Sequence, residues 1–292
     1  MINRLAAECL PADVPAFMRT PDAINEIEYL GPEPDRWRSS AEPELNAAQS
    51  PDHFIDLEYA EIIGTLPKRR YQYIAAIYVA GLTHPDMAAV LQPEKVGFQP
   101  YITSEVWERL KAAMRAYRDL STQHADTKPV EAAILFYAGW LGHYVADGSQ
   151  PLHTTINYNG WVLKDNPNGY ATEHTIHSRF ETTFVAANIT AADVHPLVST
   201  LKPVGDEWTD YLTYLHQSNS LVERVYQLDK QKGFDGAGTP EGKQFTEERL
   251  AAGASILRDL IYAAWVQSAQ PPPNVRPASP SSGYSGKPAS GF

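Results

Sequence analysis

The sequence lacks the residues that define several large protein classes. Its 292 residues include one cysteine, Cys9, which excludes an intrachain disulfide and a cysteine-rich zinc module. We expect Cys9 to be a small apolar residue in a helix. Lys and Arg number 24 against 35 Asp and Glu, and the net charge of −11 gives no chain-wide attraction for phosphate groups. No apolar run approaches about eighteen residues, so no membrane span is predicted.

Common catalytic and nucleotide-binding motifs are also missing. The chain has no GxSxG, no GxxxxGK followed by Ser or Thr, no GxGxxG and no HExxH, and the fragment DGAG at 235–238 indicates only a turn. No histidine lies three residues after a glutamate, which argues against a di-iron helical bundle. If the substrate carries phosphate, positive charge must come from metal ions held by some other set of ligands.

The spacing of the apolar residues predicts an all-α protein. These residues recur every three or four positions, and 43% hydrophobic composition is enough for a sizeable core. The predicted helices are 2–10, 12–18, 55–63, 69–81, 103–121, 128–146, 171–188, 206–230 and 241–268. We expect one multi-helix domain over residues 1–269, with Pro-, Asn- and Gly-rich loops at 31–52 and 154–170. A Pro-, Ser- and Gly-rich tail at 270–292 is predicted to be disordered.

The stretch GHYVADGSQPLH, residues 142–153, places three ligand-like side chains at the end of a core helix. His143 and Asp147 are four residues apart and therefore project from one helix face. His153 follows a glycine and a proline that are expected to end the helix. Burying polar groups of this kind without partners is costly, so they need a metal ion or hydrogen-bonding neighbours.

A second pair with the same spacing strengthens the metal interpretation. His177 and Glu181, in EHTIHSRFE, are again four residues apart, and His53 lies in PDHFID. One such pair is more often a surface ion pair or a helix-stabilising contact. Two pairs together with His53 and His153 form a set rich in nitrogen and oxygen ligands, which suits Zn²⁺.

The remaining histidines are expected to have structural or surface roles. They are His84, His124, His195 and His216. His174 is ambiguous because it lies three residues before His177. Its partner four residues on is Ser178, a poor metal ligand, so His177 is preferred.

The motifs together resemble the zinc-dependent phospholipase C and nuclease P-one superfamily. The resemblance rests on HYVADGSQPLH, on the later His-x-x-x-Glu at 177–181, and on the upstream PDRWR and PDHFID. It covers roughly residues 2 to 268. It implies an all-α fold with a three-zinc cluster at the base of a cleft, where water cleaves phosphodiester bonds.

The resemblance also implies a role for each ligand-like residue. One zinc would be held by Asp35, His53, His143 and Asp147. A second zinc would be held by His153, His177 and Glu181. Asp147 would bridge to a third zinc, and Asp35 would be both a ligand and a group that orients or deprotonates the attacking water. The attacking group would be a metal-bound hydroxide, because Zn²⁺ lowers the pKa of bound water to roughly 7.

In the superfamily the third zinc is completed by an N-terminal Trp, exposed when a signal peptide is removed, and by a nearby His. This sequence begins MINRLAAE and has no histidine before His53. We expect a genuine start upstream that encodes an export signal, then Trp and His, which would make the protein secreted or periplasmic. The alternative is an incomplete third site.

Three functions follow as hypotheses. The leading one is a single-strand-preferring endonuclease acting on DNA or RNA, with 3′-nucleotides as a further substrate. Tyr158, Trp161 and Tyr170 are candidate stacking surfaces for bases, and ordinary packing of the loop is the alternative role for each ring. The second is a phospholipase C acting on phospholipid head groups. The third is a non-catalytic helical protein with two zinc sites, which becomes the better reading if the chain truly starts at Met1. No stable protein partner is predicted.

Overall fold

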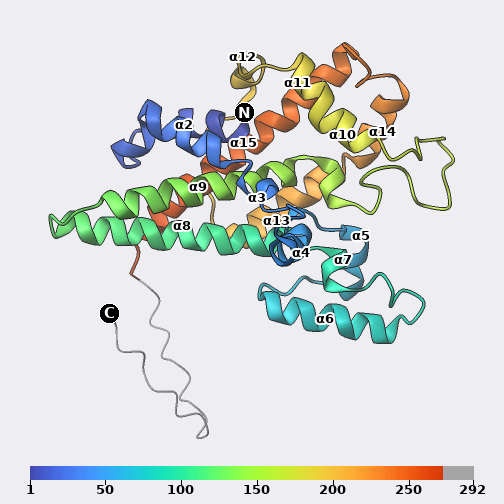
Figure 1. Cartoon of the computed structure of the whole chain (residues 1–292), viewed down its shortest axis with the longest axis horizontal. Coiled ribbons are helices and arrows are strands. Elements are labelled where there is room, and N and C mark those ends of the chain that lie inside the picture. Colours follow the sequence, from blue (N-terminus) through green and yellow to red (C-terminus); the bar gives the residue numbers. More distant parts are fainter. Residues whose placement is uncertain (272–292) are drawn as a thin grey trace, which may run out of the picture.

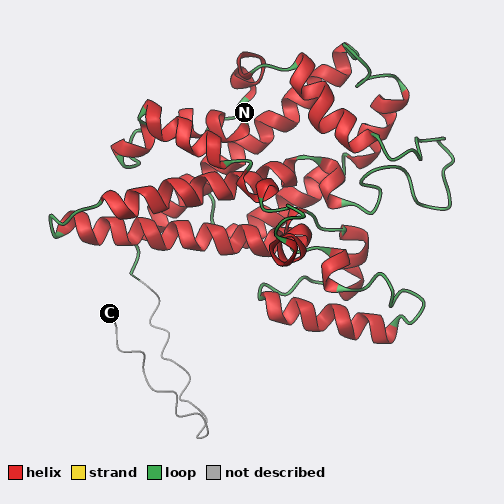
Figure 2. Cartoon of the chain, in the orientation of Figure 1, coloured by secondary structure: helices red, strands yellow, loops and turns green. Residues whose placement is uncertain are grey.

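The protein is almost entirely helical, as the apolar spacing predicts. The computed structural model describes residues 1–271, and the tail predicted to be disordered lies almost wholly outside that range. Helix accounts for 67% of the described residues, which form no sheet (Figure 2). None of the described helices is long and apolar enough to cross a membrane.

Three long helices form the centre of the fold. These are α8 (Gln99–Thr122), α9 (Lys128–Ser149) and α15 (Pro240–Ser268), which pack on one another (Figure 1). Helices α1 (Ile2–Glu8) and α2 (Pro21–Leu30) cover another side of α9. Because α9 is enclosed by all of these, its second half from Ile134 onward is largely buried.

Shorter helices surround this centre. They are α3 (Glu33–Arg36), α4 (Pro43–Gln49), α5 (Leu57–Ala60), α6 (Arg70–Thr83), α7 (Pro93–Val96), α10 (Ile176–Ser178), α11 (Val185–Asn188), α12 (Ala191–Val194), α13 (Glu207–Asn219) and α14 (Val222–Lys230). Single 3-10 turns are η1 (Ala16–Arg19), η2 (Ser50–His53), η3 (Glu61–Ile63), η4 (Pro151–Thr154) and η6 (His195–Leu197), and η5 (Arg179–Phe184) is a π-helical segment. Figure 1 shows α6 at the edge of the molecule, beyond α5 and α7.

The predicted elements differ from the observed ones mainly where apolar spacing is weak. Helix α2 was not predicted, because only Ala23 and Ile27 of its ten residues are buried. The loop predicted at 31–52 contains α3 and α4, and α4 buries none of its residues. The helix predicted at 12–18 is only the 3-10 turn η1, and the one predicted at 206–230 is two helices that meet near Ser220.

Close contact between α1 and α9 depends on Gly142. A Cβ atom at this position would lie 2.1 Å from Oδ1 of Asn3. The Asn3 side chain cannot simply move away, because its Nδ2 donates to the carbonyl oxygens of Ile27 at 3.0 Å and Gly139 at 2.9 Å. One buried amide thus joins α1, α2 and α9, directly beside His143.

We predict that Gly142→Ala lowers the free energy of unfolding by about 2–3 kcal/mol, since the added methyl group displaces Asn3 and breaks both hydrogen bonds. Urea denaturation followed by circular dichroism measures this change. Gly205→Ala is the matched control, because its Cβ would meet no atom within 4 Å. Equal stability of the two variants would contradict the packing described here.

Candidate metal centre

The fold brings all seven predicted ligand residues to one region. Asp35 comes from α3, His53 from η2, and His143 and Asp147 from the end of α9. His153 lies in η4, immediately after α9. His177 and Glu181 come from α10 and η5. The residues are separated by up to 146 positions in the sequence, so only the packing of these elements makes them neighbours.

Asp35, His53 and His143 form the first group. Each offers one ligand atom, and these atoms lie within 4.8 Å of one another. Asp35 Oδ1 is 3.9 Å from both His53 Nδ1 and His143 Nε2. His53 and His143 are buried, whereas the Asp35 side chain is 59% exposed.

The second group consists of His153, His177 and Glu181, whose ligand atoms also lie within 4.8 Å of one another. Glu181 Oε2 lies 3.2 Å from His153 Nε2 and 3.0 Å from His177 Nε2. Glu181 also accepts from Nε2 of Gln150 at 3.2 Å, which fixes its orientation. It lies in the π-helical segment η5, a distortion that is frequent at functional sites.

Asp147 lies between the two groups. Its Oδ2 is 3.1 Å from His53 Nδ1 and 3.3 Å from His143 Nε2, and its Oδ1 is 3.9 Å from His153 Nδ1. A hydrogen bond from His153 Nδ1 to the carbonyl oxygen of His53, at 2.7 Å, joins the groups a second time. The arrangement is one contiguous centre with a shared carboxylate.

Hydrogen bonds at the outer edge of the centre set the histidine tautomers. A carbonyl oxygen can only accept, so the ring nitrogen facing one must carry the proton. Nδ1 of His143 donates to Gly31 at 2.9 Å, Nδ1 of His153 to His53, and Nδ1 of His177 to Tyr158 at 3.1 Å. In the neutral forms, Nε2 of all three rings therefore presents a lone pair to the centre, which is how ligand histidines are normally oriented.

These lone pairs fit a bound cation. In the second group the Nε2 atoms of His153 and His177 face Glu181 Oε2, so the neutral rings present two lone pairs to a carboxylate oxygen, whereas the protonated rings donate to it. In the first group Nδ1 of His53 lies 3.0 Å from His143 Nε2 and 3.1 Å from Asp147 Oδ2. A metal ion at each group would satisfy the converging acceptors, and the nitrogen and oxygen set suits Zn²⁺.

The electrostatics of the centre also favour positive charge. Burial by itself lowers the pKa of His153, but Asp147 and Glu181 outweigh it and raise that pKa to about 10. Burial would raise the pKa of Glu181, yet its hydrogen bonds with His153 and His177 hold it well below the usual value. Burial would also raise the pKa of Asp147, but the positive charges of His143 and His153 outweigh burial and lower that pKa below its usual value. Protons and metal ions would compete for the same positions.

A tight backbone contact holds His53 in place. Ile55 donates its N–H to the carbonyl oxygen of His153 at 3.0 Å and forms a short bridge to Gly97. Gly97 has a positive φ of 93°, and a Cβ there would lie 2.1 Å from the carbonyl oxygen of Phe54. Glycine at 97 therefore lets the segment after α7 lie directly against Phe54, and the Ile55 hydrogen bond holds the same stretch beside η4, where His53 meets His153.

A cleft of about 660 Å³ lies beside the second group. His53 from the first group and all three residues of the second group line it. Its other lining residues include Arg38, Phe54, Asp56, Lys95 and Asn159, for which the sequence predicted no role. Arg38 belongs to the PDRWR motif and Phe54 and Asp56 belong to PDHFID, whereas Lys95 and Asn159 lie in no recognised motif.

Among the three aromatic residues suggested as stacking surfaces, only Tyr158 lines this cleft, with 55% of its surface exposed. Tyr170 and Trp161 do not line it. Tyr170 is buried, and the two rings pack against Tyr226 with centroids 5.5 and 5.2 Å away, respectively. They support the loop rather than face the cleft.

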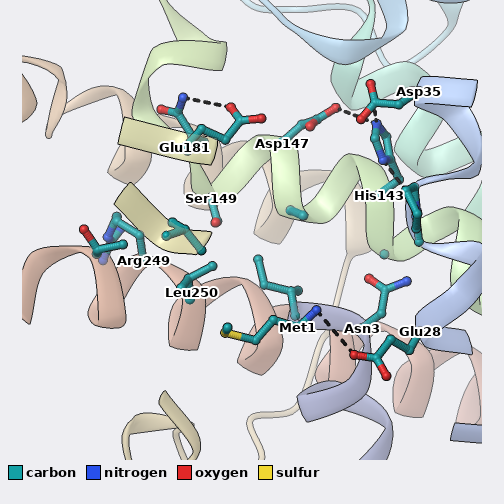
Figure 3. Close-up of a pocket in the computed structure, with 18 of the residues that line it drawn as sticks. Met1, Asn3, Glu28, Asp35, His143, Asp147, Ser149, Glu181, Arg249 and Leu250 are labelled. Atoms are coloured by element: carbon teal, nitrogen blue, oxygen red, sulfur yellow. Dashed lines mark hydrogen bonds and ion pairs between the residues drawn. The ribbon is translucent and has the colours of Figure 1, made fainter. Parts of the chain in front are cut away.

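A second, smaller cavity of about 280 Å³ lies on the opposite side of the first group. Asp35, His143 and Asp147 lie along one side of it, and Met1 and Asn3 lie across from them (Figure 3). The amino group of Met1 faces Oε1 of Glu28 at 3.7 Å. The carboxylates of Asp35 and Asp147 therefore line this cavity, and Glu181 lines both this cavity and the cleft.

The histidines expected outside the site do lie outside it. His84, His124 and His195 are exposed, and Nδ1 of His216 forms an ion pair with Glu61 at 3.4 Å on the surface. His174 is exposed and belongs to neither ligand group. Cys9 follows α1, and its Sγ lies 4.0 Å from Nε2 of His195.

No protein-family model matches the chain, and comparison with curated proteins and with solved structures likewise gives no match.

We predict that the metal-free protein takes up zinc at both groups and that His143→Ala loses about one equivalent, because the variant removes a ligand of the first group only. Elemental analysis after dialysis measures zinc per chain. Thermal unfolding with added zinc gives a second readout, since a bound ion stabilises the folded state. His216→Ala is the control, as this ring is 49% exposed on the surface. Equal zinc content in the two variants would rule out the first group as a metal site.

Proposed function

We propose that the protein is a zinc-dependent phosphodiesterase, and that its preferred substrate is single-stranded DNA or RNA. The observation that carries this function is that Asp147 joins two ligand groups beside a cleft lined by His53 and the whole second group. Neighbouring metal ions that share a carboxylate are a recurrent device for phosphodiester hydrolysis. The resemblance of HYVADGSQPLH to the phospholipase C and nuclease P-one superfamily supports the same chemistry.

Bound zinc ions would supply positive charge for the phosphate and lower the pKa of water to roughly 7. The protein's own residues would perform the other tasks. Asp35 is the most exposed carboxylate of the first group, so it can accept a hydrogen bond from an incoming water molecule. Asp147 would hold both groups in register. His153 and His177 are fixed by hydrogen bonds from Nδ1 to backbone carbonyls, which keeps the centre rigid.

The remaining side chains of the cleft favour a nucleotide. Phe54 and Tyr158 offer aromatic rings on which bases can stack. Arg38 and Lys95 supply positive charge for flanking phosphates, in a protein whose net charge is −11. Asp56 and Asn159 offer hydrogen-bonding groups for a base edge.

Asp56 is suited to contacting a base at neutral pH. Burial, and secondarily the charge of Glu58, raises the pKa of Asp56 to about 7. The carboxyl group can therefore donate or accept a hydrogen bond near that pH. Its position three residues after His53 brings it to the same cleft as the ligand groups.

A phospholipase C is the second candidate, and one feature of the cleft favours it. Tyr158 lies in the same cleft as the acidic residues Asp56, Glu94 and Glu181. An aromatic ring with neighbouring carboxylates also suits a quaternary ammonium head group. If the protein hydrolyses neither a choline phospholipid nor a nucleic acid, the third hypothesis, a non-catalytic zinc-binding protein, becomes the better description.

We predict that the zinc-loaded protein cleaves a labelled single-stranded oligonucleotide faster than the same sequence as a duplex, and that it releases no phosphocholine from phosphatidylcholine vesicles. Gel electrophoresis and a head-group assay measure the two activities. Chelation of zinc should abolish cleavage, and added zinc should restore it. If the protein releases phosphocholine but does not cleave the oligonucleotide, the nuclease proposal is wrong and the phospholipase C proposal takes its place.

We further predict that Asp56→Asn lowers the ratio of kcat/KM for the oligonucleotide to kcat/KM for bis(4-nitrophenyl) phosphate by about tenfold. The small substrate has no base to contact, and losing one good polar contact to a substrate costs about 1–3 kcal/mol. Asp86→Asn, at an exposed position, is the matched control. An unchanged ratio in Asp56→Asn would show that Asp56 does not recognise the base.

A further inference from the structure

Helix α6 exposes a continuous apolar face to solvent. Tyr71 is 86% exposed, Leu82 83%, Val79 58% and Tyr78 50%. Ala75 is exposed as well. Positions 71, 75, 78 and 82 follow the three- and four-residue spacing of one helix face, so these side chains form a single stripe along α6. We call this stripe the α6 face.

The opposite side of α6 is apolar too. Tyr73, Ile77, Ala80 and Gly81 are buried against the body of the protein. A helix that is apolar on all sides is normally buried completely or in contact with lipid. Yet α6 lies at the edge of the molecule (Figure 1), and no other segment within residues 1–271 covers the α6 face. Packing inside the described chain therefore does not account for these residues.

The segment that forms the α6 face carries no acidic residue of its own. Residues 62–85 contain no Asp or Glu, although the protein as a whole has a net charge of −11. Lys68, Arg69 and Arg70 lie at the start of the helix. Lys68 pairs with Asp206 at 3.0 Å, and Arg70 pairs with Asp52 at 3.0 Å and with Glu105 at 3.8 Å. Arg69 is exposed and has no ion pair within residues 1–271, so its charge is available next to Tyr71.

The dimensions of α6 limit what can cover it. Its 14 residues make a helix of about 21 Å. That length is too short to cross a hydrocarbon core of about 30 Å, so the helix would lie flat on a bilayer. A stable protein dimer needs roughly 800 Å² from each partner, whereas the side of one such helix, about 10 Å wide, offers a footprint of only about 200 Å². A second copy of the chain would thus need further contacts.

We propose that α6 is a docking helix for an anionic phospholipid surface. The α6 face would enter the boundary between head groups and acyl chains, with Leu82 and Val79 in the apolar region. Tyr71 and Tyr78 suit this boundary because a tyrosine ring is apolar and its hydroxyl is polar. Arg69 would lie among the anionic head groups. This docking is independent of the proposed function, since none of these residues belongs to the metal centre or its cleft.

Sedimentation of the full-length protein with vesicles tests the proposal. We expect the wild-type protein to bind vesicles of phosphatidylcholine with phosphatidylserine, and to bind pure phosphatidylcholine more weakly. Leu82→Asp should reduce the partition coefficient about tenfold or more, because it places a charge where a large apolar group was buried. Arg69→Gln should reduce it about fivefold on the anionic vesicles only, consistent with one basic residue near such a surface.

Val266→Asp is the matched control, because Val266 is an apolar residue 44% exposed on a different helix, α15. Circular dichroism should show all three variants folded. Hydrolysis of bis(4-nitrophenyl) phosphate should be equal in Leu82→Asp and Val266→Asp, so loss of docking and loss of catalysis remain distinguishable. Absence of wild-type binding, or an equal loss in Val266→Asp, would overturn the proposal. So would a wild-type dimer, seen by analytical ultracentrifugation, that Leu82→Asp dissociates.

Discussion

The buried carboxylate of Asp147 is the group around which the rest of the site is arranged. It lies near the end of α9, enclosed by helices, and its two oxygens face histidines from three separate segments. A buried negative charge is tolerated only when positive charge or hydrogen bonds compensate for it. Here the compensating groups are themselves ligand-like, so the same electrostatic requirement that stabilises Asp147 assembles the candidate metal centre.

The fold keeps this centre rigid by using backbone groups as fixed points. His143, His153 and His177 each donate from Nδ1 to a carbonyl oxygen, which directs Nε2 inward. Gly142 lets Asn3 of α1 pack against α9 beside His143, and Gly97 lets its backbone lie against Phe54, next to His53. The consequence is a candidate centre whose ligand-like side chains are held in place by the protein's own contacts.

The centre and the α6 face are separate features with separate physical origins. Polar groups converge at the centre because a buried carboxylate needs partners. Apolar groups are exposed on α6 because nothing in residues 1–271 packs over them. A protein with a net charge of −11 that hydrolyses phosphodiesters would rely on bound metal ions at the centre. To dock on an anionic lipid surface, it would rely on residues 62–85, a stretch without acidic side chains.

The sequence alone was sufficient for the helical class, for the long helices and for the ligand-like residues, because apolar spacing and His-x-x-x-Asp or His-x-x-x-Glu pairs are local patterns. It was insufficient for α2 and α4, whose residues bury little and so leave no periodic signal. It also could not place Trp161 and Tyr170, since the residue type alone does not show whether an aromatic ring is exposed for stacking or packed inside the protein. Only the tertiary structure decided that Asp147 joins two groups and that Asp56 enters their cleft. Those relations depend on distances between elements far apart in the chain, which no local pattern encodes.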